Sequence, residues 1–196
     1  MSLTKLLKYA TASATLAAIL IIILELSLPF WYNPIQDKPK PITKYSYTKE
    51  KECLKELLWY ESRNTTTKEM NAVLDVAINR YKNSNFPNDL CSIVQQDKQY
   101  SYRNNLKDKS KNILPELQNV SGKSDRLAYL NIEEIVESRF QSDSILPNKV
   151  LPENALFYHT KSIKNKPKWS RSEKVKQIEV DRSFQHRYYS VVRAVR

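Results

Sequence analysis

The chain has 196 residues, of which 41% are hydrophobic, and its formal net charge is +11. This length and apolar content suit one domain with appendages, large enough to bury a core. The single glycine, Gly122, excludes the glycine-rich phosphate loops of nucleotide-binding enzymes. A basic surface favours polyanions such as nucleic acid, anionic lipid or bacterial cell wall, but lysines also serve plain solvation, so charge alone names no partner.

The N-terminus is predicted to be a membrane segment. Residues 1–8 are short and basic, and residues 9–31 are almost entirely uncharged, with Glu25 as the exception. This run is long enough to cross a bilayer, with Trp31 as an interface anchor. No convincing small-x-small triplet follows it, which favours an uncleaved signal-anchor over a cleaved signal peptide. Because its first half is only mildly hydrophobic and Glu25 is costly at depth, the segment also resembles the signal-arrest-release segments of some phage endolysins, which can leave the membrane.

The sequence therefore predicts a single-pass protein of the inner (cytoplasmic) membrane, retained or later released, with its folded part on the periplasmic or extracytoplasmic side. Residues 32–47 contain three prolines among polar residues and are predicted to form an extended linker. The folded domain is predicted to span residues 48–196.

The first helix of this domain is predicted from Thr48, as N-cap, to Tyr60. Apolar residues lie seven, four and three positions before Glu61, so this carboxyl group continues the apolar face of the helix. A carboxyl group there is partly desolvated, which raises its pKa toward the range of a general acid. The alternative is a solvated carboxylate just beyond the last buried turn, since buried carboxylates are rare.

The clearest helix follows the capping-box pattern of residues 66–69 and carries a continuous apolar stripe from Met70 to Tyr81. Asn79 and Arg80, near its end, are expected to cap it and to complement its dipole. The remaining elements predict an α+β fold, mostly helical with a small C-terminal β region. They are an apolar element of undecided type at 90–94, an irregular or short helical stretch at 106–123, a helix at 125–140, a loop at 163–171, and strands at 155–160, 177–180 and 187–192.

Two cysteines, Cys53 and Cys91, allow one disulfide, which is expected if the domain is exported, whereas a cytosolic chain would keep two buried thiols. A zinc site made of these cysteines with His159 and His186 is disfavoured, because no pair among the four has the short spacing of zinc motifs.

Four segments carry a family resemblance. The stretch Tyr60-Glu61-Ser62-Arg63-Asn64 resembles the Tyr-x-Glu-Ala-Arg-Gly-Glu signature of the SleB/CwlJ-type cell-wall hydrolases. The other matches follow in the family's order. The family's Ala-Val-x-x-Val-x-x-Asn-Arg helix resembles Ala72 to Arg80, and its Phe-Pro…Gln-Phe-Ser segment resembles Phe86-Pro87 through Cys91 to Gln99-Tyr100-Ser101. Its Tyr-His…Trp…His-x-Phe-Tyr end resembles Tyr158-His159, Trp169 and His186-Arg187-Tyr188-Tyr189. The resemblance covers roughly residues 50 to 190.

The resemblance implies a lysozyme-like fold, of the kind shared with lytic transglycosylases, and cleavage of the β-1,4 bond between MurNAc and GlcNAc in peptidoglycan, in cell lysis or wall remodelling. Glu61 would be the catalytic acid. The substrate-binding residues would be Gln99, Tyr100, Ser101, Tyr158, His159, Trp169 and His186, and Arg63, Asn79 and Arg80 would support the Glu61 turn. The implied partners are peptidoglycan glycan strands and, through the N-terminal segment, the membrane; no cofactor, metal or nucleic acid is implied.

A glycoside hydrolase needs a second carboxylate, and neither Asp75 nor Asp97 is a good candidate, so a lytic transglycosylase with one essential acid is favoured. The chain departs from the family signature at Asn64 and Thr65, where the family has Gly and Glu. Loss of that second Glu removes an electrostatic partner for Glu61. The alternatives are an inactive, membrane-anchored wall-binding protein and a zinc-dependent N-acetylmuramoyl-L-alanine amidase.

Overall fold

The computed structural model describes residues 44–141 and 144–192. The predicted membrane segment at 9–31 and most of the predicted linker lie outside the described residues. Among the described helices, none combines the length and apolar character that crossing a bilayer requires.

Three helices form the core of the domain. Helix α2 spans Lys44–Ser62, α3 spans Thr67–Lys82, and the short α4 spans Leu90–Gln95. Two predictions need correction here: residues 44–47, predicted as linker, are already helical, and Thr48 is therefore no N-cap. The helix continues two residues past Tyr60, which keeps Glu61 inside its last turn.

Helix α3 is the central element. Every residue from Glu69 to Arg80 is buried, including the polar ones, because α2 packs on one side and strand β3 on the other. Its N-cap is Thr66, whose side chain accepts a hydrogen bond from the Glu69 backbone N–H, as the capping-box pattern predicts. The Glu69 carboxylate does not complete the box, because it binds His186 instead.

The other long helix, α5, spans Lys123–Glu137 and packs against α2. It ends before Phe140, where the sequence pattern predicted its end, and the chain then forms a two-stranded hairpin of β1 (Phe140–Gln141) and β2 (Ser144–Ile145). Between α4 and α5 the chain is irregular apart from two 3-10 turns, η1 (Ser101–Arg103) and η2 (Leu117–Asn119).

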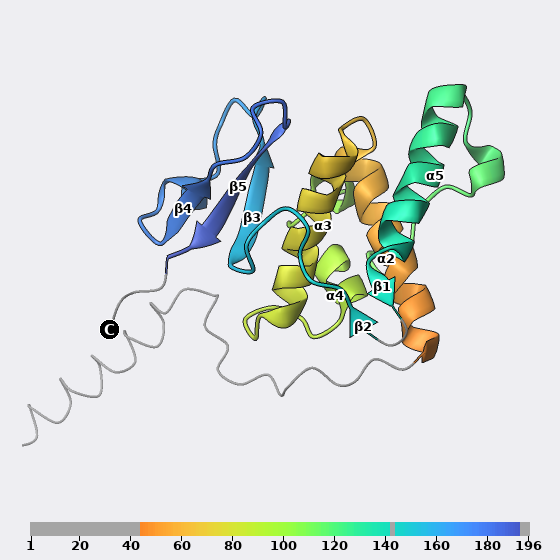
Figure 1. Ribbon diagram of the computed structural model, residues 1–196, viewed down its shortest axis with the longest axis horizontal. Helices are drawn as coiled ribbons and strands as arrows, with labels where there is room; N and C mark the ends of the chain where they lie inside the picture. Colours follow the sequence, from red (N-terminus) through yellow and green to blue (C-terminus); the bar gives the residue numbers. More distant parts are fainter. Residues whose placement is uncertain (1–43, 142–143, 193–196) are drawn as a thin grey trace, which may run out of the picture. The chain divides into compact units, whose positions relative to one another are not determined.

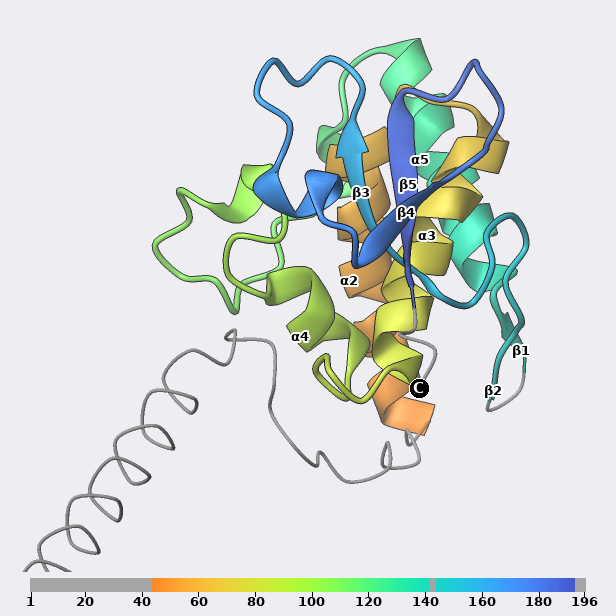
Figure 2. The ribbon, with the colours of Figure 1, turned by 90° about the vertical axis from the view of Figure 1, so that its left-hand side faces the viewer.

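A small antiparallel sheet covers α3 (Figures 1 and 2). Its strand order is β3-β5-β4, with β3 at Ala155–Thr160, β4 at Val175–Ile178 and β5 at His186–Val191. A 3-10 turn, η3 (Lys168–Arg171), lies between β3 and β4. The helices and the sheet make the mixed helical and β architecture that the sequence predicts.

The register of the sheet separates its two faces. Tyr158 pairs with Tyr188 and Thr160 with His186, so these side chains lie on the face toward α3. Phe157 pairs with Tyr189 on the opposite, outer face. The alternation therefore places Tyr158 and Tyr188 on one face of the sheet and Phe157 and Tyr189 on the other.

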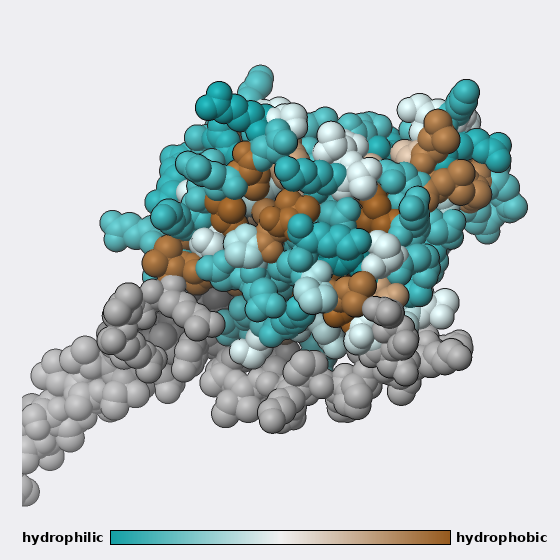
Figure 3. Space-filling model, viewed as in Figure 1, coloured by the Kyte–Doolittle hydropathy of each residue, from teal (hydrophilic) through white to brown (hydrophobic). Residues whose placement is uncertain are grey.

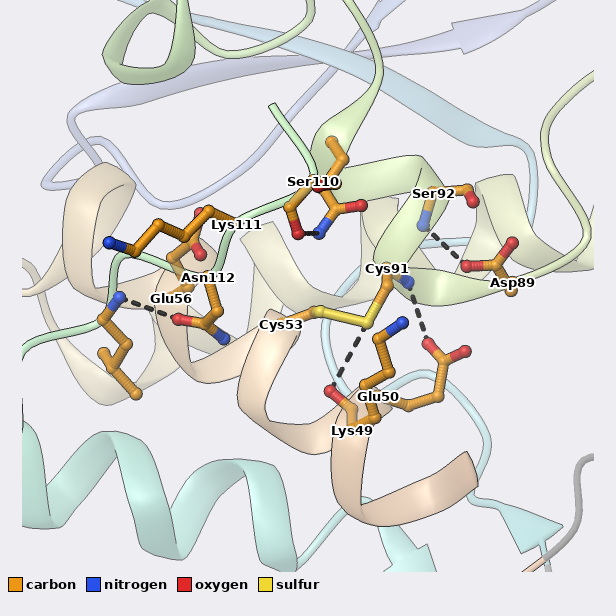
Figure 4. The surroundings of a disulfide bond; sticks show 12 residues. Lys49, Glu50, Cys53, Glu56, Asp89, Cys91, Ser92, Ser110, Lys111 and Asn112 are labelled. Carbon is orange, nitrogen blue, oxygen red and sulfur yellow. Dashed lines mark hydrogen bonds between the residues drawn. A yellow bond between two sulfur atoms is a disulfide. The ribbon is translucent and has the colours of Figure 1, made fainter. Parts of the chain in front are cut away.

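A disulfide between Cys53 of α2 and Cys91 of α4 joins two helices that are 38 residues apart in sequence (Figure 4). Both sulfurs are buried, and the Cys91 backbone N–H donates to the Glu50 carboxylate at 2.9 Å. The bridge fixes the N-terminal half of α2 to the segment that leads into Tyr100. Outside this core, the face of the molecule in Figure 3 is largely hydrophilic, with only small groups of apolar residues.

Candidate active site

Glu61 lies in the last turn of α2, at the end of the face that buries Leu54, Leu57 and Leu58. Its side chain is partly buried, and the Tyr158 hydroxyl donates a hydrogen bond to its Oε2 at 3.2 Å. Burial raises the pKa of Glu61 from 4.5 to about 7, although the Tyr158 hydrogen bond and the charge of Arg80 both lower it. The group can therefore hold a proton near neutral pH and release it in a reaction.

Arg80 connects the site to the sheet. Its Nε donates to the Leu156 carbonyl at 2.8 Å, and one of its terminal nitrogens donates to the Tyr100 hydroxyl at 3.2 Å. The guanidinium also lies 5.4 Å from the centre of the Phe86 ring and 5.8 Å from that of Phe157. These contacts fix β3, and hence Tyr158, at a set distance from α2.

Tyr158 packs against His186, which is bound to the buried carboxyl group of Glu69. The ring of His186 meets the Tyr158 ring edge-on, with centroids 5.1 Å apart. Glu69 Oε1 accepts from the His186 backbone N–H at 2.8 Å and lies 2.7 Å from its Nδ1. Burial lowers the pKa of His186, so the imidazole is neutral and donates its Nδ1 proton to the carboxylate. His186 therefore packs behind the site rather than at its surface.

The other acidic groups near the site are committed to structural partners. Glu56 is buried, pairs with Arg103 and accepts from the Ile113 N–H at 2.9 Å. Asp75 is fully buried, lies 2.8 Å from the Arg139 guanidinium and accepts from three backbone N–H groups of residues 149–151. Each of these buried carboxyl groups is therefore occupied by an arginine and by backbone N–H groups.

Asp97, the second candidate weighed from the sequence, is exposed and pairs with Lys109, which holds the pKa of that carboxyl below its usual range. Glu61 thus differs from Glu56, Asp75 and Asp97 in having no salt bridge to any described residue.

The aromatic surface beside Glu61 includes Tyr60 and Tyr102, which are not among the predicted substrate-binding residues. The Tyr60 ring stacks on the Tyr102 ring with centroids 4.6 Å apart, and Tyr102 lies 6.2 Å from Tyr100. Tyr60 is 37% exposed. The available signal was the Tyr-x-Tyr alternation at 100–102 together with a tyrosine directly before Glu61. Exposed aromatic faces of this kind stack on the apolar faces of sugar rings.

The predicted substrate-binding residues divide into two groups. Tyr100 and Tyr158 lie by Glu61, although Tyr100 is buried and presents its hydroxyl to Arg80. Gln99 is partly buried in the preceding turn, and Ser101 is exposed at the start of η1. All four come from the segments nearest the end of α2.

By the register of β3, His159 lies on the sheet face that carries Phe157 and Tyr189, opposite to the face of Tyr158, and Trp169 packs on the same face. His159 Nε2 accepts from the Tyr189 hydroxyl at 3.0 Å, and its Nδ1 donates to the Thr160 carbonyl at 2.9 Å. Trp169 packs against Phe157 and Tyr189, with both centroid distances at 5.2 Å. The sequence motif does not distinguish the two faces, because that depends on the register of β3 with β5.

The predicted supporting residues contact the ends of α2 and β3. Asn79 is no helix cap, since α3 continues to Lys82 with Asn83 as C-cap; its amide donates to the Pro152 and Ala155 carbonyls. Arg63 donates to the Trp59 carbonyl at 3.2 Å and lies over the Trp59 ring, so it stabilises the end of α2. Asn79 and Arg80 therefore attach β3 to α3.

Glu61 does not line either of two hollows found on the described part of the domain. One, of about 540 Å³, is lined by polar residues at the end of α3 and by the start of β3. The other, of about 400 Å³, lies beside β4 and the start of β5. We place the site by its chemistry, which is the partly buried carboxyl group of Glu61 and the Tyr158 hydroxyl bound to it.

A metal site is not formed by the residues considered for one. Cys53 and Cys91 are joined to each other, so neither is a thiolate ligand. Within residues 44–141 and 144–192, no group of three His, Cys, Asp or Glu side chains is placed to hold a metal ion.

Together the fold and the site define an α+β domain. A partly buried carboxylic acid, Glu61, lies at the end of α2 and accepts a hydrogen bond from the Tyr158 hydroxyl of strand β3. The family model described as Cell Wall Hydrolase matches residues 64–189. The chain belongs to this SleB/CwlJ-type cell-wall hydrolase family. Membership of the family indicates hydrolysis of peptidoglycan. No curated protein and no solved structure gives a significant match. The family match begins three residues after Glu61, so the role of Glu61 rests on the geometry above.

Proposed function

We propose that the protein cleaves the β-1,4 bond between MurNAc and GlcNAc in peptidoglycan as a lytic transglycosylase, with Glu61 as the general acid and then the base. The observation that carries this proposal is the partly buried Glu61 carboxyl group, whose pKa is raised to about 7 and whose Oε2 accepts from Tyr158. A lysozyme-like arrangement, with a helix-borne acid facing a small sheet, is part of the same proposal.

In the proposed reaction, protonated Glu61 gives its proton to the glycosidic oxygen as the bond from that oxygen to the anomeric carbon breaks. Positive charge then develops on the sugar ring. The sugar's own hydroxyl attacks the anomeric carbon and passes its proton to the Glu61 carboxylate. The acid is regenerated, and no water is consumed.

The choice of a transglycosylase over a hydrolase is supported by the state of the other carboxylates. Glu56, Asp75 and Glu69 are each buried and bound to a cationic or imidazole partner. Asp97 is exposed in a loop and paired with a lysine. Among the described residues near Glu61, none of these is available to activate a water molecule.

The product distinguishes the possibilities. Purified peptidoglycan is incubated with the protein and with its Glu61→Gln variant, and the released fragments are identified by mass spectrometry. Anhydro-ended fragments that the variant does not form support the proposal. Reducing ends from wild type would instead establish a hydrolase, and chelator-sensitive release of stem peptides an amidase. No release by wild type would favour a wall-binding protein.

We further propose that the domain works outside the cytoplasm, on a chain held in the membrane by residues 9–31 or released from it. The disulfide between Cys53 and Cys91 supports an oxidising location. Cysteine labelling of intact cells with a membrane-impermeant thiol reagent, before and after reduction, tests this: new labelling only after external reduction is expected, and labelling without reduction would contradict it.

A further inference from the structure

The positive charge of the chain is concentrated in one exposed segment. Residues 164–176, here called the basic segment, contain Lys164, Lys166, Lys168, Arg171, Lys174 and Lys176, but only one acidic residue, Glu173. All six cationic side chains are exposed. The segment therefore supplies a net charge of +5 within 13 residues, against +11 for all 196.

These cations form no salt bridge with a carboxylate of the described residues. Arg171 meets only the Lys166 carbonyl, at 3.5 Å. Elsewhere, cations such as Lys55 and Arg103 do pair with carboxylates. Repulsion among like charges that lack partners destabilises the free protein. An external anion bound to them would reduce this repulsion and is therefore favoured.

The basic segment is held in place by its aromatic residue. Trp169 of η3 packs on Phe157, His159 and Tyr189 of the outer sheet face. The last residues of the segment enter β4, where Lys176 pairs with Ser190 of β5. The cations are thus presented by a fixed turn rather than by a free tail. Since the turn follows β3, which carries Tyr158, it is connected to the site but lies on the other face of the sheet.

We propose that the basic segment is a second binding surface, which takes a phosphodiester-bearing anionic polymer attached to the cell wall. The six exposed cations are close together in sequence, and a polymer with a phosphate in each repeat offers several anions to them at once. Phosphate oxygens accept charge-assisted hydrogen bonds from Lys and Arg, so no enclosed pocket is needed. A lipid surface fits less well, because the Trp169 ring that would enter the interface is packed inward on the sheet. A single-stranded nucleic acid fits less well for the same reason, since the Trp169 ring packs on the sheet and is not free to stack on bases. Duplex DNA, which proteins bind through its phosphates, is distinguished from a wall polymer by the experiment below.

The surface would bring the enzyme to its substrate without taking part in the bond cleavage proposed for Glu61. It therefore goes beyond the proposed function and does not depend on the reaction type. Binding can be measured with the Glu61→Gln background, so a failure of the proposed chemistry leaves this test intact.

The test uses the full chain with Glu61→Gln, and compares two triple variants in that background. One carries Lys164→Gln, Lys166→Gln and Lys168→Gln. The matched control neutralises three exposed lysines outside the segment that also lack salt bridges, Lys98, Lys107 and Lys123. The probes are wall fragments that keep their phosphodiester polymers, the same fragments stripped of them by acid, vesicles with anionic lipid, and duplex DNA, each at several salt concentrations.

We expect the first triple variant to bind unstripped wall at least about tenfold more weakly than the control variant, and its plot of log affinity against log salt to be shallower by about two to three. The Glu61→Gln protein with an unmutated basic segment should bind stripped wall about as weakly as the first triple variant binds unstripped wall. Equal losses in both triple variants would overturn the proposal in favour of diffuse net charge. Equal binding to stripped wall, or tighter binding to vesicles or DNA, would overturn it as well.

Discussion

Replacement of Glu61 by Gln is expected to stabilise the protein at alkaline pH while abolishing its proposed activity. The pKa of Glu61 is raised from 4.5 to about 7 because its carboxylate is desolvated in the folded state. At about 1.4 kcal/mol per pH unit, that difference corresponds to about 3 kcal/mol. The side chain is mostly shielded from water, so little discount for solvent screening applies.

The sign follows from proton binding. Between pH 4.5 and 7 the folded state binds more protons at Glu61 than the unfolded state, so its contribution to stability falls as pH rises. Below pH 4.5 both states are protonated, and above pH 7 both are ionised, with the folded state destabilised by about 3 kcal/mol. A glutamine stays neutral and can still accept from Tyr158, so the variant avoids this cost.

The assay is denaturant unfolding of the full chain in mild detergent at pH 4 and pH 8.5. We expect the free energies of unfolding of wild type and Glu61→Gln to agree at pH 4 and the variant to exceed wild type by about 2–3 kcal/mol at pH 8.5. Glu50, whose pKa burial also raises to about 7, is present in both proteins and cancels. Glu134→Gln, a control at an exposed residue of α5, should show no such difference. Equal stabilities at pH 8.5 would refute the desolvation of Glu61.

Three further predictions follow from the same contacts. Tyr158→Phe removes a hydrogen bond that lowers the pKa of Glu61, so the alkaline limb of the pH–rate profile should move upward from about pH 7; a downward shift would contradict the hydrogen bond. Reduction of the Cys53–Cys91 bridge, which closes a loop of 38 residues, should lower the unfolding free energy by about 4 kcal/mol, measured by denaturation with and without reductant; no change would argue against the bridge. Asp75→Asn leaves a buried guanidinium unpaired and should cost about 3–5 kcal/mol by the same measurement, whereas a cost below 1 kcal/mol would contradict the buried ion pair.

The sequence predicts those parts of the fold that depend on local pattern. The apolar stripe of α3 and the capping hydroxyl of Thr66 are local signals, and both are present in the structure. The position of Glu61 at the end of a buried stripe was likewise readable from spacing alone. Strand β3 was predicted with its observed bounds because its aromatic and β-branched residues lie between two turns.

Features that depend on long-range contacts were not predictable in this way. The start of α2 at Lys44 conflicts with the nearby prolines, which suggested a linker. The roles of His159 and Asn79 depend on strand register and on a loop some 70 residues away, neither of which leaves a local trace. The same is true of Glu69, whose capping-box position gave no hint of its partner His186.

The two departures from the family signature, Asn64 and Thr65, have a local explanation. The Thr65 backbone N–H donates to the Ser62 carbonyl at 2.9 Å and its hydroxyl donates to the same oxygen at 2.8 Å, which closes the turn after α2. The turn therefore forms without the glycine. Tyr158, rather than an acidic neighbour, is the partner of Glu61 here.

The most direct test of Glu61 as the catalytic acid is the rate of peptidoglycan cleavage at pH 6 by wild type, Glu61→Gln and Glu134→Gln, a change at an exposed residue of α5, with unfolding measured in parallel to show that each variant is folded. We expect Glu134→Gln to cleave at the wild-type rate and Glu61→Gln, although at least as stable at pH 8.5, to lose activity by a factor of about 10²–10⁴ or more. A folded Glu61→Gln protein that cleaves peptidoglycan within a few-fold of the wild-type rate would contradict the assignment of Glu61 as the catalytic acid.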